Sequence, residues 1–278
     1  MGKSLSERQI QQYEAQGFLA PLRVFPAAQA ALYRGKLEEL ETGRGGSLSH
    51  DERRKTHLYL QWVDEIVHHP LILDAVEDLL GADLLLYTLT TWIKEPNTDA
   101  FISWHQDSTY FGLSPPEHVT AWVALSPSTI QSGCVEVVPG SHKRGQIPHA
   151  QSNTTDNMLR TGQQLEVGAD SAVEMLVLQP GEFSLHHTHL FHNSRPNRSD
   201  DRRIGLGISY IPARTRCVCK TRLTAMLVRG QDQGYFELER RPAADLEPAG
   251  LSRHADSIKR WHQAREELIP LAHGTDGY

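Results

Sequence analysis

Short apolar segments separated by turn residues constrain the fold of this chain more than any other feature of its sequence. From Ala82 onward, such segments alternate with turn signals such as Pro139-Gly140 and Pro180-Gly181. Their β-branched, aromatic and leucine residues predict strands at 83–94, 119–125, 134–138, 173–178, 183–191 and 204–211. Because no regular alternation of strands and helices occurs, a Rossmann-type sheet is disfavoured. We expect a mainly β protein with flanking helices and an antiparallel barrel or jelly-roll core.

Helical patterns flank this β region. At the N-terminus, Ser6 and Gln9 can form a capping box before a short helix that Gly17 ends, and Pro26 and Pro70 each introduce a further helical segment. Near the C-terminus, apolar residues recur at helical spacing in a charged background: Ile258, Trp261, Ala264 and Leu268. This pattern predicts an amphipathic helix that packs on the barrel as core cover.

The length of the chain predicts a single catalytic domain. With 278 residues and 39% hydrophobic content, the chain can bury one substantial core, so we expect one domain over residues 1–278. Within it, residues 1–81 are predicted to be mostly helical, 82–215 to form the core, and 216–278 to form a C-terminal extension with a helix. Residues 143–170 are polar and show little periodicity, which is typical of a lid.

Charge and cysteine content exclude several classes of partner. The net charge of −6 is spread along the chain, so no basic field would gather nucleic acid or an anionic membrane. The first 17 residues are polar and lack the apolar run of a signal peptide. No apolar run in the sequence approaches the roughly 20 residues that span a bilayer. The three cysteines, Cys134, Cys217 and Cys219, cannot all pair with one another. Two thiols, as in Cys217-Val-Cys219, are too few ligands for a tetrahedral zinc site, so we expect free cysteines. We therefore expect a cytoplasmic protein with a small-molecule partner, either monomeric or homo-oligomeric.

The motif Trp104-His-Gln-Asp107 suggests a metal site. In an extended chain, residues two apart point to the same side, so His105 and Asp107 share a face. An imidazole and a carboxylate leave most of a metal's coordination sphere unfilled, so a third ligand must come from elsewhere. Two histidines and one carboxylate, with open positions, form the facial triad that suits non-haem iron(II).

The candidates for the third ligand are His186, His187, His189 and His192. If one strand runs through them, His186 and His192 face one side while His187 and His189 face the other. At most one of these pairs then points into the barrel. Strand parity alone leaves His186 and His192 both open.

Arg203 follows His192 by eleven residues, at the start of an apolar strand. A guanidinium is permanently charged and offers a fork of donors, which suits bidentate capture of the distal carboxylate of a dicarboxylic cosubstrate. Arg202 is the neighbouring alternative, but its side chain should point the opposite way.

Taken together, these motifs resemble the phytanoyl-CoA dioxygenase family of iron(II)- and 2-oxoglutarate-dependent oxygenases. The matching elements occur in family order: Trp104-His-Gln-Asp107, Gly133-Cys-Val-Glu-Val-Val-Pro-Gly-Ser-His142, Leu178-Gln-Pro-Gly181, Phe191-His-Asn-Ser194 and 197–203. The resemblance implies a double-stranded β-helix core, which is a cupin-like jelly roll. It also implies an Fe(II) cofactor with 2-oxoglutarate and O₂ as cosubstrates, and the release of succinate and CO₂.

The resemblance further implies roles for individual residues. His192 becomes the distal metal ligand beside His105 and Asp107, and Arg203 becomes the residue that binds 2-oxoglutarate. Trp122 and Thr90 are placed next to that cosubstrate. Related halogenases have a small residue at the carboxylate position, so Asp107 favours hydroxylation of an unactivated C–H bond.

Residues near the metal motif and in the lid are candidates for substrate binding. Ser108 and Tyr110 follow the motif directly, and Asn157, Arg160 and Gln163 lie in the lid. These groups suit a small polar or zwitterionic molecule, such as an amino acid derivative or an aminophosphonate. A natural-product intermediate is equally compatible with them.

Two alternatives share the same barrel. The first is a cupin-like zinc or manganese hydrolase or isomerase, which has no evident need for Arg203 at the cosubstrate position. The second is a non-catalytic ligand-binding barrel that has kept the fold.

Overall fold

The computed structural model describes residues 2–151, 154–159 and 163–272; for 109, 110 and 270–272 it describes the backbone alone. Its core consists of a seven-stranded and a four-stranded sheet. The larger sheet has the order β1 (Phe18–Arg23), β10 (Glu182–His187), β5 (Val119–Ala124), β12 (Arg203–Pro212), β2 (Leu84–Lys94), β14 (Thr224–Arg229) and β15 (Glu237–Leu238). The smaller has the order β3 (Ile102–His105), β11 (His192–Ser194), β6 (Val135–Val137) and β9 (Glu174–Leu176).

Two short strand pairs and the helices complete the described structure. The pairs are β13 (Arg216–Cys217) with β4 (Leu113–Ser114), and β7 (Ala150–Gln151) with β8 (Gln163–Gln164). The α-helices are α1 (Glu7–Gln16), α2 (Ala27–Arg44), α3 (Gln61–Val67), α4 (Pro70–Leu80) and α5 (Pro248–Ala272). The 3₁₀ helices are η1 (Thr56–Leu58), η2 (Asp107–Tyr110) and η3 (Ser141–Arg144).

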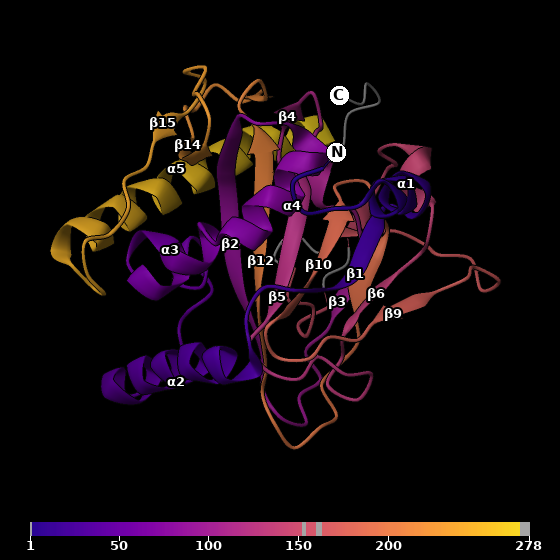
Figure 1. Cartoon of the computed structure of the whole chain (residues 1–278), viewed down its shortest axis with the longest axis horizontal. Coiled ribbons are helices and arrows are strands. Elements are labelled where there is room, and N and C mark those ends of the chain that lie inside the picture. The colour runs from indigo at the N-terminus through magenta and orange to yellow at the C-terminus, as the bar shows by residue number, and fades with distance from the viewer. Residues whose placement is uncertain (1, 152–153, 160–162, 273–278) are drawn as a thin grey trace.

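The two sheets pack face to face, and helices cover the outside of the larger one. Between the sheets, Trp122 of β5 belongs to an apolar cluster with Val135 and Val137 of β6. On the outer face, Leu206 of β12 and Trp62 of α3 belong to a second cluster. Figure 1 shows α2 and α3 on the side of the molecule away from β3, β6 and β9. This arrangement confirms the predicted jelly roll with flanking helices.

Strand β12 is buried on both faces along its whole length, because it lies in the middle of the larger sheet with helices outside and the smaller sheet inside. Its glycines make room for aromatic rings. A Cβ atom at Gly205 would lie 2.2 Å from the indole of Trp122, and one at Gly207 would lie 2.9 Å from that of Trp92. The absence of a Cβ atom at these two glycines lets the indoles pack closely against the strand.

One predicted strand is wrong. The sequence predicts a continuous strand over 183–191, but β10 ends at His187 and β11 begins at His192 in the other sheet. Between them the chain turns, with the Leu190 amide donating to the His187 carbonyl at 2.9 Å. Strand parity therefore does not relate His186 to His192, and both reach the same cavity from different sheets.

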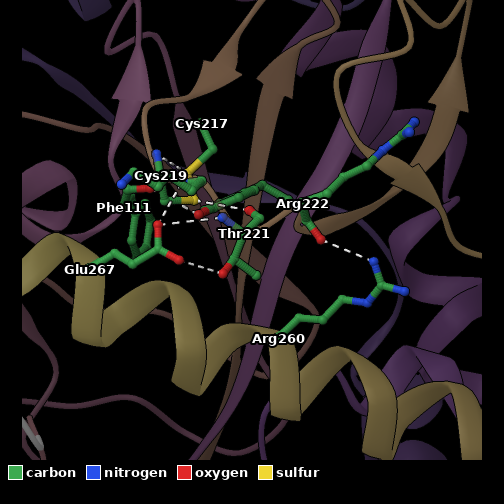
Figure 2. Close-up of a disulfide and its surroundings, with 9 residues drawn as sticks. Phe111, Cys217, Cys219, Thr221, Arg222, Arg260 and Glu267 are labelled. Atoms are coloured by element: carbon green, nitrogen blue, oxygen red, sulfur yellow. Dashed lines mark hydrogen bonds between the residues drawn. A yellow bond between two sulfur atoms is a disulfide. The ribbon is translucent and has the colours of Figure 1, made fainter.

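The expectation of free thiols is also wrong for two of the cysteines. Cys217 and Cys219 form a disulfide, and their Cα atoms lie 5.4 Å apart, within the usual range for such a bond. Cys134 is free and buried. Figure 2 shows the disulfide beside α5, where Glu267 accepts hydrogen bonds from the backbone of Lys220 and from the hydroxyl of Thr221. This contact ties the chain after β13 to the helix.

The helical predictions are confirmed at both ends of the chain, where α1 and α5 form. Ser6 and Gln9 form the capping box of α1, and Gly17 ends this helix with a positive φ of 85°.

In the part of the chain that the structure describes, no helix combines the length and the apolar character needed to cross a membrane.

Candidate active site

Three side chains converge where β3 meets β11. His105 is the last residue of β3, His192 is its partner across the antiparallel pair, and Asp107 opens η2. The Nε2 atoms of His105 and His192 lie 3.7 and 3.6 Å from Oδ1 of Asp107. Ligand atoms from all three residues fall within 4.8 Å of one another, which is close enough to share one metal ion.

Backbone carbonyls orient both imidazoles. Nδ1 of His105 lies 2.9 Å from the carbonyl oxygen of Ser103, and Nδ1 of His192 lies 2.9 Å from that of Leu190. A carbonyl can only accept, so Nδ1 of each ring carries the hydrogen. In the neutral rings, Nε2 then presents its lone pair to the space beside Asp107.

The second oxygen of Asp107 is held by the larger sheet. Thr120 of β5 donates its hydroxyl hydrogen to Oδ2 at 2.8 Å, and its oxygen lies 2.8 Å from Nε2 of His118. His186 places Nε2 3.6 Å from the same Oδ2. Burial opposes ionisation of Asp107, but His192 together with His105 and His186 outweighs burial and holds the pKa of this carboxyl well below its usual range. Asp107 is therefore an anion with Oδ1 turned to the two histidines.

Arg203 lies in the same cavity, at the start of β12. Its guanidinium is buried, with its carbon atom 5.1 Å from the centre of the Trp122 ring, and its Nε and Nη2 atoms have no hydrogen-bond partner among the described residues. Burial lowers the pKa of Arg203 to about 10, so the group stays charged at neutral pH. A buried cation with unused donors needs an anion, and a carboxylate fits this guanidinium fork.

Lys94 adds a second buried basic side chain beside Arg203, its partner in the register of β2 and β12. Its Nζ donates to the carbonyl and hydroxyl oxygens of Ser194 at 2.9 and 2.7 Å and also to the carbonyl of Arg195. Burial and the positive charge of Arg203 lower the pKa of Lys94 to about 6. The family resemblance places this end of β2 near the cosubstrate, but nothing in the sequence indicates that the side chain of Lys94 is buried.

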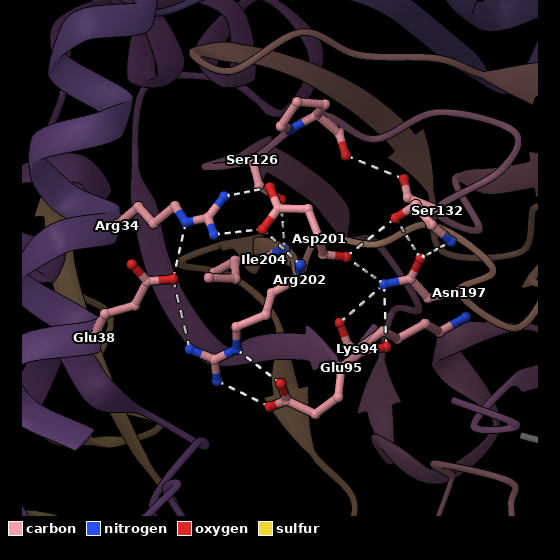
Figure 3. A network of polar contacts seen from close by, with 12 residues as sticks. Arg34, Glu38, Lys94, Glu95, Ser126, Ser132, Asn197, Asp201, Arg202 and Ile204 are labelled. Atoms are coloured by element: carbon pink, nitrogen blue, oxygen red, sulfur yellow. Dashed lines mark hydrogen bonds and ion pairs between the residues drawn. The ribbon is translucent and has the colours of Figure 1, made fainter. Parts of the chain in front are cut away.

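Arg202 points the opposite way, as the alternation along the strand predicts. Figure 3 shows its guanidinium paired with Glu95 and directed toward Glu38, in a network that Arg34 and Asp201 extend. Its neighbour Arg203 thus faces the cavity while Arg202 joins an ion network on the outside.

The residues predicted to bind cosubstrate and substrate divide into three groups. Trp122, Thr90 and Gln163 line the cavity that holds the metal triad. Ser108 and Asn157 do not: Ser108 donates to Gln146, and Asn157 ties the lid to β3 through a 2.9 Å bond to the hydroxyl of Ser103.

The last two predicted substrate residues cannot be placed in this way. Arg160 and the side chain of Tyr110 fall outside the described residues.

The predicted lid follows the edge of the smaller sheet. The Met158 amide donates to the carbonyl of Phe101 at 2.8 Å, and the Leu165 amide donates to that of Trp104 at 2.9 Å. As a result, Met158, Leu159 and Gln163 line the cavity.

Sequence reasoning missed the outer wall of the cavity. Trp261 and Arg265 of α5 line it together with Arg54, which precedes η1. The prediction that α5 is simple core cover is therefore incomplete, because Ala264 packs in the core while Trp261 reaches the cavity. In the sequence, the aromatic Trp261 among the apolar positions of the helix was the signal that could have indicated this role.

The fold and the site together define a non-haem iron enzyme that uses 2-oxoglutarate. The model of the phytanoyl-CoA dioxygenase family matches residues 13–205, and the chain belongs to this family. The enzyme is an iron- and 2-oxoglutarate-dependent dioxygenase.

Individual relatives agree with this assignment. The chain is 26% identical over 224 residues to a probable alpha-ketoglutarate-dependent hypophosphite dioxygenase of Stutzerimonas stutzeri, covering 74% of this chain and 78% of the relative. It is 31% identical to a 1-deoxypentalenic acid 11-beta-hydroxylase of Streptomyces arenae, over 50% of this chain and 52% of the relative. The apo structure of the non-heme monooxygenase ThoJ superposes with a TM-score of 0.83 at 32% identity, covering 94% of this chain and 98% of that one.

Proposed function

We propose that the enzyme hydroxylates an unactivated C–H bond of a small organic molecule, with release of succinate and CO₂. The observation that carries this proposal is the convergence of His105, Asp107 and His192 in one cavity with the unpartnered donors of Arg203. A zinc or manganese hydrolase or isomerase on the same barrel would leave those donors without a use. A non-catalytic barrel would have no need for the metal triad.

In this proposal, His105, Asp107 and His192 would hold Fe(II), which would supply the chemistry that activates O₂ at the expense of 2-oxoglutarate. The chain fixes the geometry of that site. Thr120 holds Oδ2 of Asp107 on the side away from His105 and His192, so Oδ1 is the oxygen presented to the metal. The backbone bonds of the two imidazoles remove their freedom to rotate.

Arg203 binds the distal carboxylate of 2-oxoglutarate, and Trp122 packs against the guanidinium to hold it in place. Thr90 lines the wall next to this pair. Ile102 and Val135 provide apolar lining from the smaller sheet, which excludes water from the reacting atoms. Gln163 is the one described residue of the proposed substrate group that faces the cavity.

We propose a substrate that is a small polar or zwitterionic molecule, such as an amino acid derivative or aminophosphonate, or a natural-product intermediate. Two relatives are named for oxidising hypophosphite and 1-deoxypentalenic acid, which are both oxyanions in neutral water. These names support an acidic substrate. Asp107 at the carboxylate position supports hydroxylation as the outcome.

A metabolite screen tests the proposal. Wild-type enzyme with Fe(II), 2-oxoglutarate and air should release succinate and add one oxygen to a substrate from the panel. His192→Ala should abolish both products, whereas His189→Ala removes a neighbouring imidazole that does not line the cavity and should retain them. Absence of succinate with every compound would contradict the proposed function.

A further inference from the structure

We propose that the outer half of the cavity is a substrate subsite for an acidic group, a carboxylate or phosphonate, carried on an apolar body. Arg54 and Arg265 would bind the acidic group, and Trp261 would lie against the apolar part. This inference rests on the proposed function, because the same cavity contains the metal triad and Arg203.

The subsite is built from two segments that are far apart in the sequence. Arg54 comes from the loop before η1, while Trp261 and Arg265 come from one face of α5, four residues apart. The guanidinium carbon of Arg54 lies 4.3 Å from the centre of the Trp261 ring. Stacking engages the flat face of a guanidinium, while its N–H groups point outward in its plane, where an oxyanion can accept from them.

The backbone at Arg54 is fixed on both sides. Its carbonyl oxygen lies 2.9 Å from Nε2 of His254 on α5, and Arg54 forms an isolated bridge with Thr90 on β2. The next residue, Lys55, donates its amide to the carbonyl of Leu89 at 2.7 Å. This fixed backbone and the stack on Trp261 restrict the side chain, which lowers the cost of ordering it on binding.

The charges that line this part of the cavity favour an anion. Among the described residues, Asp51 is the acidic side chain that lines this part of the cavity, and its Oδ2 lies 3.0 Å from Nε2 of His262. Asp107 belongs to the metal site. Among the described residues of the outer cavity, the two arginines Arg54 and Arg265 outnumber the one carboxylate of Asp51, inside a protein whose net charge is −6. Such a local field attracts an anion and orients it.

Apolar side chains in the same part of the cavity favour a substrate with an apolar body. The rings of Phe111 and Trp261 meet edge to face with centroids 6.1 Å apart, and both line the cavity. Met158 and Leu159 line it as well. Aromatic and thioether groups favour contact with a hydrocarbon skeleton. The preferred substrate class is therefore an amphipathic acid rather than a fully hydrophilic one.

Calorimetric titration with matched probes tests this subsite. The probes are phenylacetate, 4-phenylbutyrate and benzylphosphonate, each paired with a neutral analogue: phenylacetamide, 4-phenylbutanamide and the phosphonate's dimethyl ester. Titrations are done anaerobically with Fe(II) and saturating 2-oxoglutarate, so that Arg203 is already occupied. At least one acid should bind wild type about tenfold more tightly than its neutral partner, the effect of one charge-assisted hydrogen bond.

Arg54→Gln and Arg265→Gln remove the charge but keep a polar side chain, and each should reduce that preference to about twofold or less, as loss of a charge-assisted bond predicts. Arg260→Gln is the matched control. It lies on the same helix, where it donates to the carbonyl of Arg222 (Figure 2) and to Asp256, and it does not line the cavity. This variant should keep the wild-type preference. Thermal unfolding verifies that each variant is folded.

The proposal is overturned if no acid binds wild type, if the neutral analogues bind as tightly as the acids, or if both cavity arginine variants keep the preference. Failure of the proposed function gives a different pattern. In that case no compound of the metabolite panel leads to succinate release, while the acid preference of the anaerobic enzyme still depends on Arg54 and Arg265.

Discussion

The hydroxyl of Thr120 decides which oxygen of Asp107 can face a metal, because it donates to Oδ2 at 2.8 Å. Thr120→Val keeps the shape of the side chain and removes this bond. We expect Fe(II) affinity to fall about tenfold, the usual effect of losing a hydrogen bond that orients a metal ligand. Titration with Fe(II) under anaerobic conditions measures it.

Thr88→Val provides the control for this change. Thr88 lines the same cavity from β2, but its buried hydroxyl has no hydrogen-bond partner among the described residues. Its replacement should leave Fe(II) affinity unchanged. Equal losses in the two variants would show that cavity polarity, rather than the bond to Asp107, controls metal binding.

Gly205 sets the position of Trp122 and thereby of Arg203. A methyl group at this position would lie 2.2 Å from the indole, so Gly205→Ala must displace the ring. We expect a loss of about 1–3 kcal/mol in stability, typical of overpacking, together with weaker 2-oxoglutarate binding. Urea unfolding and calorimetric titration measure the two effects.

Gly35→Ala is the matched glycine control. Gly35 lies in the interior of α2 with nothing within 4 Å of the added methyl, so the change should stabilise the protein by about 0.5–1 kcal/mol. A folded Gly205→Ala variant with wild-type affinity for 2-oxoglutarate would refute the role given to Trp122.

Single residues of the site were predictable where the local backbone is extended. His105 and Asp107 share a face because Gln106 between them has extended dihedral angles, φ −117° and ψ 139°. The same reasoning failed at His186 because a turn interrupts the strand before His192. The position of that turn depends on pairing with β5 and β3, which no local pattern encodes.

At the scale of elements, a buried ionic cluster fastens β14, β15 and η1 together. Glu239 follows β15, and its carboxylate lies 2.6 Å from Nζ of Lys55 and 3.0 Å from Nε2 of His57. Thr224 donates its hydroxyl to the same group. Burial opposes ionisation, but the cation of Lys55 outweighs it and lowers the pKa of Glu239 to about 2.

Glu239→Gln should destabilise the protein by about 3 kcal/mol at neutral pH, because it leaves the buried Lys55 cation without its partner. The folded pKa of about 2 lies below the ordinary value of 4.5, so Glu239 stabilises the fold fully above that value and loses this effect as pH falls toward 2. The difference in unfolding free energy between wild type and variant should therefore shrink over this range.

Glu237→Gln in β15 removes an exposed carboxylate and serves as the control, since its ion pair with Arg222 is long at 3.9 Å. Urea unfolding at several pH values compares the three proteins. A difference for Glu239→Gln that stays constant down to pH 2 would contradict the pKa assigned to Glu239.

The role of α5 shows why element patterns predict packing better than function. The apolar spacing of Ile258, Trp261, Ala264 and Leu268 correctly predicts a helix with one buried face. That pattern does not distinguish burial against a core from exposure to a cavity. Ala264 and Trp261 belong to the same face, yet only the indole is long enough to reach the cavity.

At the scale of the whole molecule, the jelly roll was predictable because alternating segments and turn residues are local signals. The cavity was predictable only in its inner half, where the metal motif and Arg203 belong to recognisable spacings. Its outer half joins Arg54 to Trp261 across most of the chain. Such contacts arise from tertiary packing, so the spacing of residues in the sequence does not predict them.

The most direct test of the central claim is the visible spectrum of the anaerobic enzyme with Fe(II) and 2-oxoglutarate. We predict a weak charge-transfer band in wild type, its loss in His192→Ala and its weakening in Arg203→Ala. Arg202→Ala should keep the band, because that side chain points to the outer ion network. A wild-type enzyme without the band, or an Arg203→Ala variant that binds 2-oxoglutarate as wild type does, would contradict the account.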